Sequence, residues 1–120
     1  MMDTHEKKEL KDQYKRMQPR MGVFAIIHRG TSRCFLDIST DIPSMFNRME
    51  FQLKMGMHPC KALQADWKAE GESAFAFEVL DTLTYRDEVT RATYVEELKT
   101  LKAMWIEKLN HEGNLTLYPH

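Results

Sequence analysis

The sequence has 120 residues, of which 42% are hydrophobic and 29% are charged, with a formal net charge of −1. This length and composition are typical of one globular domain with its own core, and they exclude the disordered and fibrous classes. No apolar run approaches the roughly 18 residues of a membrane span, and the charged start is unlike a secretory signal, so a cytoplasmic location is expected.

The charges are distributed unevenly along the chain. Lys and Arg outnumber Asp and Glu over residues 15–68, and the reverse holds over residues 69–113. One locally basic surface is therefore expected, although a pI near 6.5 is not typical of a dedicated nucleic-acid-binding protein. Cys34, Cys60 and the scattered histidines have no metal-ligand spacing, so we expect two reduced, packed thiols and no metal or cofactor.

The first predicted element is a helix at the start of the chain. Asp3 is a candidate N-cap, apolar residues then recur at helical spacing up to Met17, and Pro19 ends the pattern. We expect this helix, within residues 1–20, to pack on a single domain formed by residues 21–120.

A β-hairpin is predicted next. The run from Met21 to Ile27 is apolar and rich in β-branched residues, and a second apolar run extends from Arg33 to Ile38. The segment between them, His28 to Ser32, has the composition of a turn.

Two helices are predicted after the hairpin. Asp41 followed by Pro43 is typical of a helix cap and first turn, and apolar residues then recur at helical spacing until Gly56. A shorter helix is predicted from Pro59 to Ala69, with Gly71 as its stop.

The last predicted elements are a strand and a long helix. Residues alternate in character from Phe75 to Leu80, and an apolar stripe runs from Val89 to Leu109. Trp67 and Trp105 fall on the apolar stripes of their helices, so both are expected in the core. The order αββααβα predicts an α+β domain with a three-stranded antiparallel sheet flanked by helices.

Several short motifs in these elements resemble the GIY-YIG endonuclease domain. Gly22-Val23-Phe24 stands where the family has Gly-Ile-Tyr, and Phe35-Leu36-Asp37 where it has Tyr-Ile-Gly or Tyr-Val-Gly. The similarity spans about residues 21–110, and its order and spacing are closest to a short bacterial subgroup in which the domain stands alone after an N-terminal helix. The remaining matching motifs are Phe51-Gln52-Leu53-Lys54-Met55-Gly56, His58, Leu63-Gln64, Trp67, Gly71, Phe77-Glu78-Val79-Leu80 and Trp105-Ile106-Glu107-Lys108-Leu109.

The resemblance implies the fold of a nuclease and a particular set of catalytic groups. In the family, a metal-assisted water hydrolyses a phosphodiester bond. A Tyr on the first strand helps to activate the water, an Arg on a helix binds the phosphate charge, and a Glu on the last helix binds a divalent cation. A late Asn completes the set.

None of these groups is kept at the matching positions. A phenyl ring or a thioether cannot transfer a proton or bind phosphate, and an ammonium group repels a cation. The resemblance therefore implies a GIY-YIG-like domain without nuclease activity. The former catalytic positions, in chain order, hold Phe24, Phe35, Met45, Lys102 and Leu117.

Three functions remain open. The first is a non-catalytic binding or regulatory module with weak affinity for nucleic acid, carried by Arg29, Arg33, Arg48, Lys54 and Lys61. The second is a protein-interaction module or homodimer that uses the apolar residues of the former cleft, namely Phe24, Phe35, Met45 and Met49. The third is a cryptic metal-dependent nuclease in which Asp37, with Glu50 or Asp41, holds a metal. The apolar replacements either fill the former cleft or leave it open, and the sequence does not decide between these outcomes.

Overall fold

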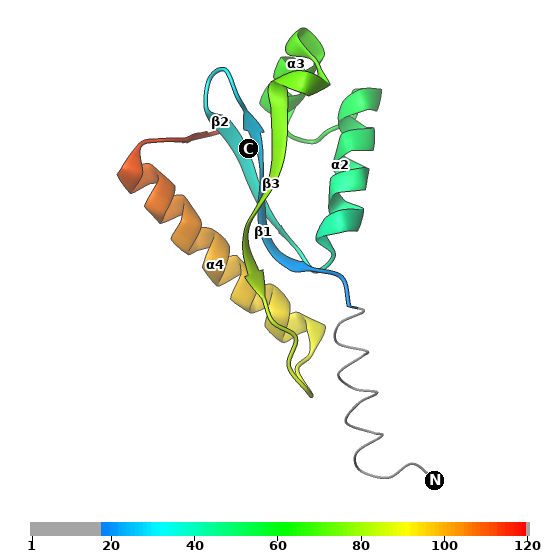
Figure 1. Ribbon diagram of the computed structural model, residues 1–120, viewed down its shortest axis with the longest axis vertical. Coiled ribbons are helices and arrows are strands. Elements are labelled where there is room, and N and C mark those ends of the chain that lie inside the picture. The colour runs from blue at the N-terminus through cyan, green and yellow to red at the C-terminus, as the bar shows by residue number, and fades with distance from the viewer. Residues whose placement is uncertain (1–17, 120) are drawn as a thin grey trace.

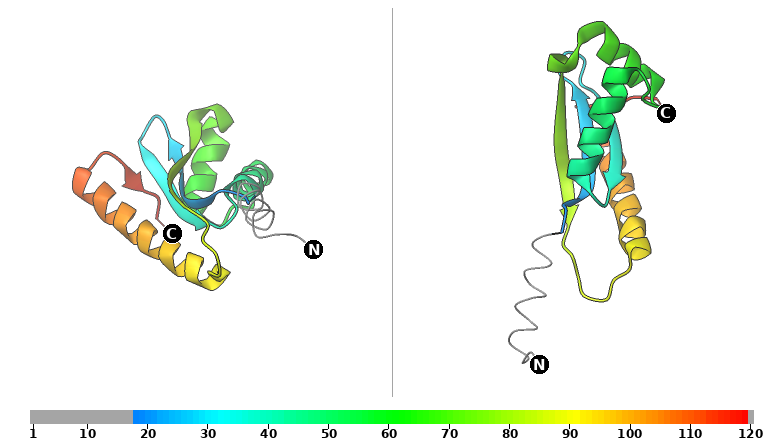
Figure 2. Two further views of the ribbon diagram at one scale, coloured as in Figure 1. Left: turned by 60° about the horizontal axis from the view of Figure 1, so that its bottom comes forward. Right: turned by 90° about the vertical axis from the view of Figure 1, so that its right-hand side faces the viewer.

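The computed structural model describes residues 18–119, so the helix expected before Pro19 lies almost entirely outside the described residues. A sheet with the strand order β3-β1-β2-β4 forms the centre of the domain (Figure 1). Helices α2 and α3 lie on one face of this sheet, and the long helix α4 lies on the other (Figure 2). The elements are β1 (Met21–His28), β2 (Arg33–Ser39), α2 (Ile42–Met55), α3 (Lys61–Glu70), a 3-10 turn (Glu72–Ala74), β3 (Phe75–Leu83), α4 (Arg91–Glu112) and β4 (Thr116–Leu117).

The α+β class and the predicted order of elements after residue 20 are confirmed, with one addition. β1, β2 and β3 are antiparallel neighbours as expected, but β4 adds a short strand parallel to β2, so the sheet is mixed. Two backbone bonds hold β4: the Thr116 amide donates to the Ser32 carbonyl at 3.0 Å, and the Tyr118 amide donates to the Cys34 carbonyl at 2.8 Å. A two-residue strand is too short for any hydrophobic period, which is why the sequence did not predict it.

The ends of α2 follow the capping residues predicted from the sequence. The Asp41 carboxylate accepts from the Ser44 amide at 3.1 Å and begins α2, and Gly56 ends it in the left-handed conformation with a φ of 74°. Thr90 caps α4 by accepting from the Thr93 amide. No described helix combines the length and hydropathy that crossing a membrane would need.

β1 and β3 approach each other closely at Gly22. The register between the two strands shifts between Val23 and Phe24, which leaves Leu80 as an extra residue on β3. At this bulge, a Cβ on Gly22 would lie 1.8 Å from the Asp81 carbonyl oxygen. The glycine of the Gly22-Val23-Phe24 motif is therefore required by the structure, because only glycine lets the two backbones come this close.

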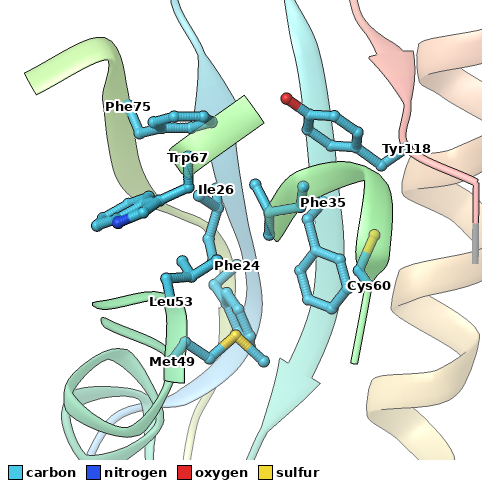
Figure 3. Close-up of a cluster of buried hydrophobic side chains, with 10 residues drawn as sticks. Phe24, Ile26, Phe35, Met49, Leu53, Cys60, Trp67, Phe75 and Tyr118 are labelled. Atoms are coloured by element: carbon cyan, nitrogen blue, oxygen red, sulfur yellow. The ribbon is translucent and has the colours of Figure 1, made fainter. Parts of the chain in front are cut away.

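The core has two parts, one on each face of the sheet. The part under α4 contains Val23, Ala25, Cys34, Leu36 and Leu109. The part under α2 and α3 is larger and rich in aromatic rings (Figure 3). Its buried residues are Phe24, Ile26, Phe35, Met49, Leu53, Cys60, Leu63, Trp67, Phe75 and Tyr118.

The two tryptophans differ in their surroundings. Trp67 is buried in the α2/α3 part of the core, as predicted. Trp105 is only half-buried: its indole nitrogen donates to an Asp81 carboxylate oxygen at 3.1 Å, and Lys108 lies over its ring at 4.7 Å. The core prediction for Trp105 therefore holds only in part, because this side chain lies where α4 meets the outer strand β3.

Candidate functional site

A cleft of about 450 Å³ opens beside β2, on the face of the sheet that α2 and α3 cover. α2 forms one wall, the segment before α3 forms a second, and α4 contributes Lys102. The cleft brings together Phe35, Met45 and Lys102, which are distant in sequence and which the resemblance matches to catalytic positions of the family. Its lining residues are Phe35, Asp37, Met45, Arg48, Met49, Gln52, His58, Pro59, Cys60 and Lys102.

The two phenylalanines lie at and beneath the floor of this cleft. Phe24 is fully buried and packs edge-on against Phe46, with a ring centroid distance of 5.4 Å. Phe35 belongs to the buried cluster shown in Figure 3. It packs edge-on against the His58 ring, with a ring centroid distance of 5.0 Å. Met45, at the rim, is half-buried. The apolar replacements thus fill the floor, while the cleft above them stays open.

Leu117 lies elsewhere. It pairs with Cys34 in the sheet, and its side chain packs with Leu115 against the part of the core under α4. Neither Leu117 nor Phe24 lines the cleft, but Phe24 packs with Phe35 in the same part of the core, whereas Leu117 lies on the other face of the sheet.

An ion pair crosses the cleft between β2 and α4. The Lys102 ammonium lies 3.5 Å from an Asp37 carboxylate oxygen, and both side chains are about one third exposed. The same Asp37 oxygen accepts a hydrogen bond from the Ile38 amide at 2.8 Å. Asp37 is the only carboxylate among the lining residues that the structure describes, and this pair neutralises it.

The carboxylates suggested for a rebuilt metal site do not converge. Asp41 caps α2 through Ser44, and Glu50 pairs with Lys54 at 3.0 Å on the same helix. Neither lines the cleft with Asp37. Within residues 18–119, no group of three or more His, Cys, Asp or Glu side chains could hold a metal ion.

The five basic candidates are also placed differently from one another. Arg48 is exposed at the cleft and makes no ion pair with a described residue, whereas the others do not line the cleft. Lys54 pairs with Glu50 and with Glu72, and Arg33 lies 3.7 Å from Asp66. Arg29 and Lys61 are exposed, at the hairpin turn and at the start of α3.

His58 and Cys60 also line the cleft, although no functional role was predicted for either. The His58 amide donates to the Gln64 side chain at 3.0 Å, and Gln64 in turn donates to the Leu53 carbonyl at 2.9 Å. The Cys60 amide donates to His58 Nδ1 at 3.0 Å. Gln64 therefore ties the segment before α3 to the end of α2, which explains the matching Leu63-Gln64 motif and fixes the position of His58.

Both cysteines are free and buried, as expected. Burial raises the pKa of the Cys34 thiol above its usual value, which keeps it protonated. The Cys60 thiol donates to the Pro119 carbonyl at 3.4 Å. Beside it, the Tyr118 hydroxyl donates to Asp66 at 2.7 Å, and burial together with that carboxylate raises the pKa of Tyr118. These contacts attach the segment around β4 to α3.

Comparison with protein-family models and with curated proteins finds no match. Among solved structures, the catalytic domain of the homing endonuclease I-TevI is similar, with a TM-score of 0.64 and 18% sequence identity over 83% of this chain and 99% of that one. A mutant of the catalytic domain of the intron endonuclease I-TevI gives a TM-score of 0.63 and 18% identity, over 81% of this chain and 91% of that one. At this identity the likeness concerns the fold, and it agrees with the order of strands and helices described above. The chain has the fold of the GIY-YIG endonuclease domain.

Proposed function

We propose that this chain is a catalytically inactive GIY-YIG-like domain that acts as a binding or regulatory module, with weak affinity for nucleic acid at the cleft. The ion pair between Lys102 and Asp37 carries this proposal. A hard divalent cation needs anionic oxygen ligands, and the resemblance assigns the position of Lys102 to such a ligand. An ammonium group there repels the cation, and it also forms an ion pair with the Asp37 carboxylate, which would otherwise be available to a metal.

The floor of the cleft supports the same conclusion. Phe24 and Phe35 carry no hydroxyl where the family has tyrosines, and Met45 carries no donor where it has an arginine. Loss of a single preorganised donor costs on the order of 100- to 1000-fold in rate. The combined loss removes the groups that, by the resemblance, would activate water and stabilise the developing charge.

Arg48 supports residual affinity for nucleic acid. Its exposed guanidinium at the cleft has no carboxylate partner among the described residues, and a guanidinium binds phosphate through two parallel hydrogen bonds. Binding through one such group is weak and sensitive to salt.

We expect the purified chain not to cleave plasmid or branched DNA in the presence of magnesium or manganese, because the cleft offers no free carboxylate to either ion. Gel analysis after prolonged incubation measures this. Metal-dependent cleavage that disappears in Asp37→Ala would contradict the proposal and favour the cryptic nuclease.

We expect Arg48→Ala to weaken retention of the chain on DNA and to reduce the slope of log affinity against log salt by about one. Lys54→Ala is the matched control, because Lys54 is on the same helix but is already neutralised by Glu50 and Glu72. A salt titration of fluorescently labelled DNA gives both slopes. Equal slopes for the two variants, or no binding by the unmodified chain at low salt, would remove the support for a nucleic-acid ligand.

The alternative of a protein interface made of Phe24, Phe35, Met45 and Met49 has less support. Phe24 and Phe35 are buried in the sheet beneath α2 and α3, and Met49 is buried on the inner face of α2, so Met45 is the one residue of these four that is more than slightly exposed to a partner. A molecular mass that rises with concentration and falls in Met45→Glu would favour this alternative.

A further inference from the structure

β3 is an outer strand of the sheet with one unpaired edge. It runs for nine residues, Phe75–Leu83, and pairs with β1 on one side only. No described strand pairs with its other side, and the right-hand view of Figure 2 shows no element beyond it. An unpaired edge of this length presents amide and carbonyl groups that another strand can bind.

A groove lies between β3 and α4, on the face of the sheet that α4 covers. Its volume is about 320 Å³, and its lining residues are Asp81, Leu101, Met104, Trp105 and Lys108. Met104 is 59% exposed, so its side chain is accessible to a ligand in the groove. In an added strand, every second side chain points to the same face of the sheet, so one of them would meet this groove.

The bulge near Gly22 shapes the groove. Leu80 packs against the part of the core under α4, and the next residue, Asp81, accepts a hydrogen bond from Trp105. Two successive β3 residues therefore contact the α4 side, and they hold the Trp105 ring in place beside the strand edge.

The charges on β3 select the kind of strand that fits. Glu78 is exposed, makes no ion pair with a described residue, and lies opposite Ala25, whose side chain belongs to the α4 side. A second copy of β3 would bring its own Glu78 and Asp81 to this edge, and like charges on paired strands are destabilising. A strand with a basic side chain opposite Glu78 would be stabilised instead, and an apolar side chain suits the groove itself, which Lys108 also lines.

We propose that the edge of β3 binds an extended peptide in which apolar and basic residues share the face toward α4. One apolar side chain enters the groove beside Met104 and Trp105, and a basic side chain lies opposite Glu78. This interaction is separate from the cleft, because no residue lines both sites.

The test uses a peptide of about ten residues in which the side chains of one strand face alternate between valine and lysine. Amide hydrogen exchange on the unmodified chain should slow within residues 75–83 as peptide is added, because free edge amides become paired. In the Trp67→Phe variant, the emission of Trp105 should shift with the same saturation curve. The matching peptide with glutamate in place of lysine should bind about tenfold more weakly, and so should Glu78→Lys with the lysine peptide.

Met104→Glu should also weaken binding, whereas Met55→Glu should not. Met55 is 60% exposed and serves as the matched control because it is on α2, on the opposite face of the sheet from α4, and does not line the groove. Absence of saturable exchange protection at millimolar peptide would overturn the proposal. Protection centred on residues of the cleft, or equal effects of the two methionine variants, would overturn it as well.

Discussion

Gly22→Ala is expected to destabilise the domain by about 3 kcal/mol or more, which is among the largest effects of any single change in this chain. The added Cβ would overlap the Asp81 carbonyl oxygen, which lies 1.8 Å away, and it would also crowd the Asp81 carbonyl carbon and Thr82 Cα. All three atoms belong to the backbone of β3, so no side-chain rotation can relieve the overlap. β1 and β3 would have to separate at the bulge.

Thermal unfolding and urea titration measure this effect, and a domain of this size should lose more than about 10 °C of melting temperature. Gly30→Ala is the control. Gly30 is exposed in the hairpin turn, where the new Cβ would meet only the side chain of His28 at 3.3 Å. We expect a change within about 1 kcal/mol there. If Gly22→Ala were equally mild, the close approach of β1 and β3 would not exist in solution.

Phe24→Ala is expected to cost about 3 to 5 kcal/mol, whereas Met45→Arg should change stability by no more than about 1 kcal/mol. Phe24 is fully buried and packs against Phe46 and the rest of the α2/α3 core, so truncation leaves a cavity. Met45 is half-buried on the rim of an open cleft, where an arginine can keep its charged end in water.

Urea denaturation at a fixed temperature compares these two variants, with Met45→Leu as the uncharged control. If Met45→Arg lost several kcal/mol while Met45→Leu did not, the arginine would be an unpaired buried charge. That outcome would mean that the cleft is closed in solution. Near-neutral behaviour of both supports an open site available to a ligand.

Much of this fold could be predicted from the sequence, because the elements carry strong local signals. The β1-β2 hairpin follows from two β-branched runs around a turn, and Asp41 with Gly56 marks both ends of α2. β4 could not be predicted, since a two-residue strand depends on backbone pairing with Arg33 and Cys34 and not on its own side chains.

The candidate site was predicted less completely. The positions matched by motif, Phe35, Met45 and Lys102, do meet at the cleft. The position of Leu117 was assigned by counting along the chain, and this count did not reveal that Leu117 lies on the other face of the sheet. The basic candidates could not be sorted by sequence either, because ion pairing with acids from another element, as between Lys54 and Glu72, appears only in the folded chain.

The contact between Tyr118 and the α2/α3 core bears on how the domain folds during synthesis. Tyr118 is 1% exposed and packs among residues that leave the ribosome much earlier, including Phe24 and Phe35. Folding from the N-terminal side can form the β1-β2 hairpin and place α2 on it, but that core lacks one aromatic ring until Tyr118 has emerged. Until then the outer edge of β2 at Cys34 is unpaired, because β4 has not yet formed. The nascent domain therefore exposes the edges of both β2 and β3 to aggregation or chaperone binding, whereas among the described strands of the finished domain β3 has the long unpaired edge.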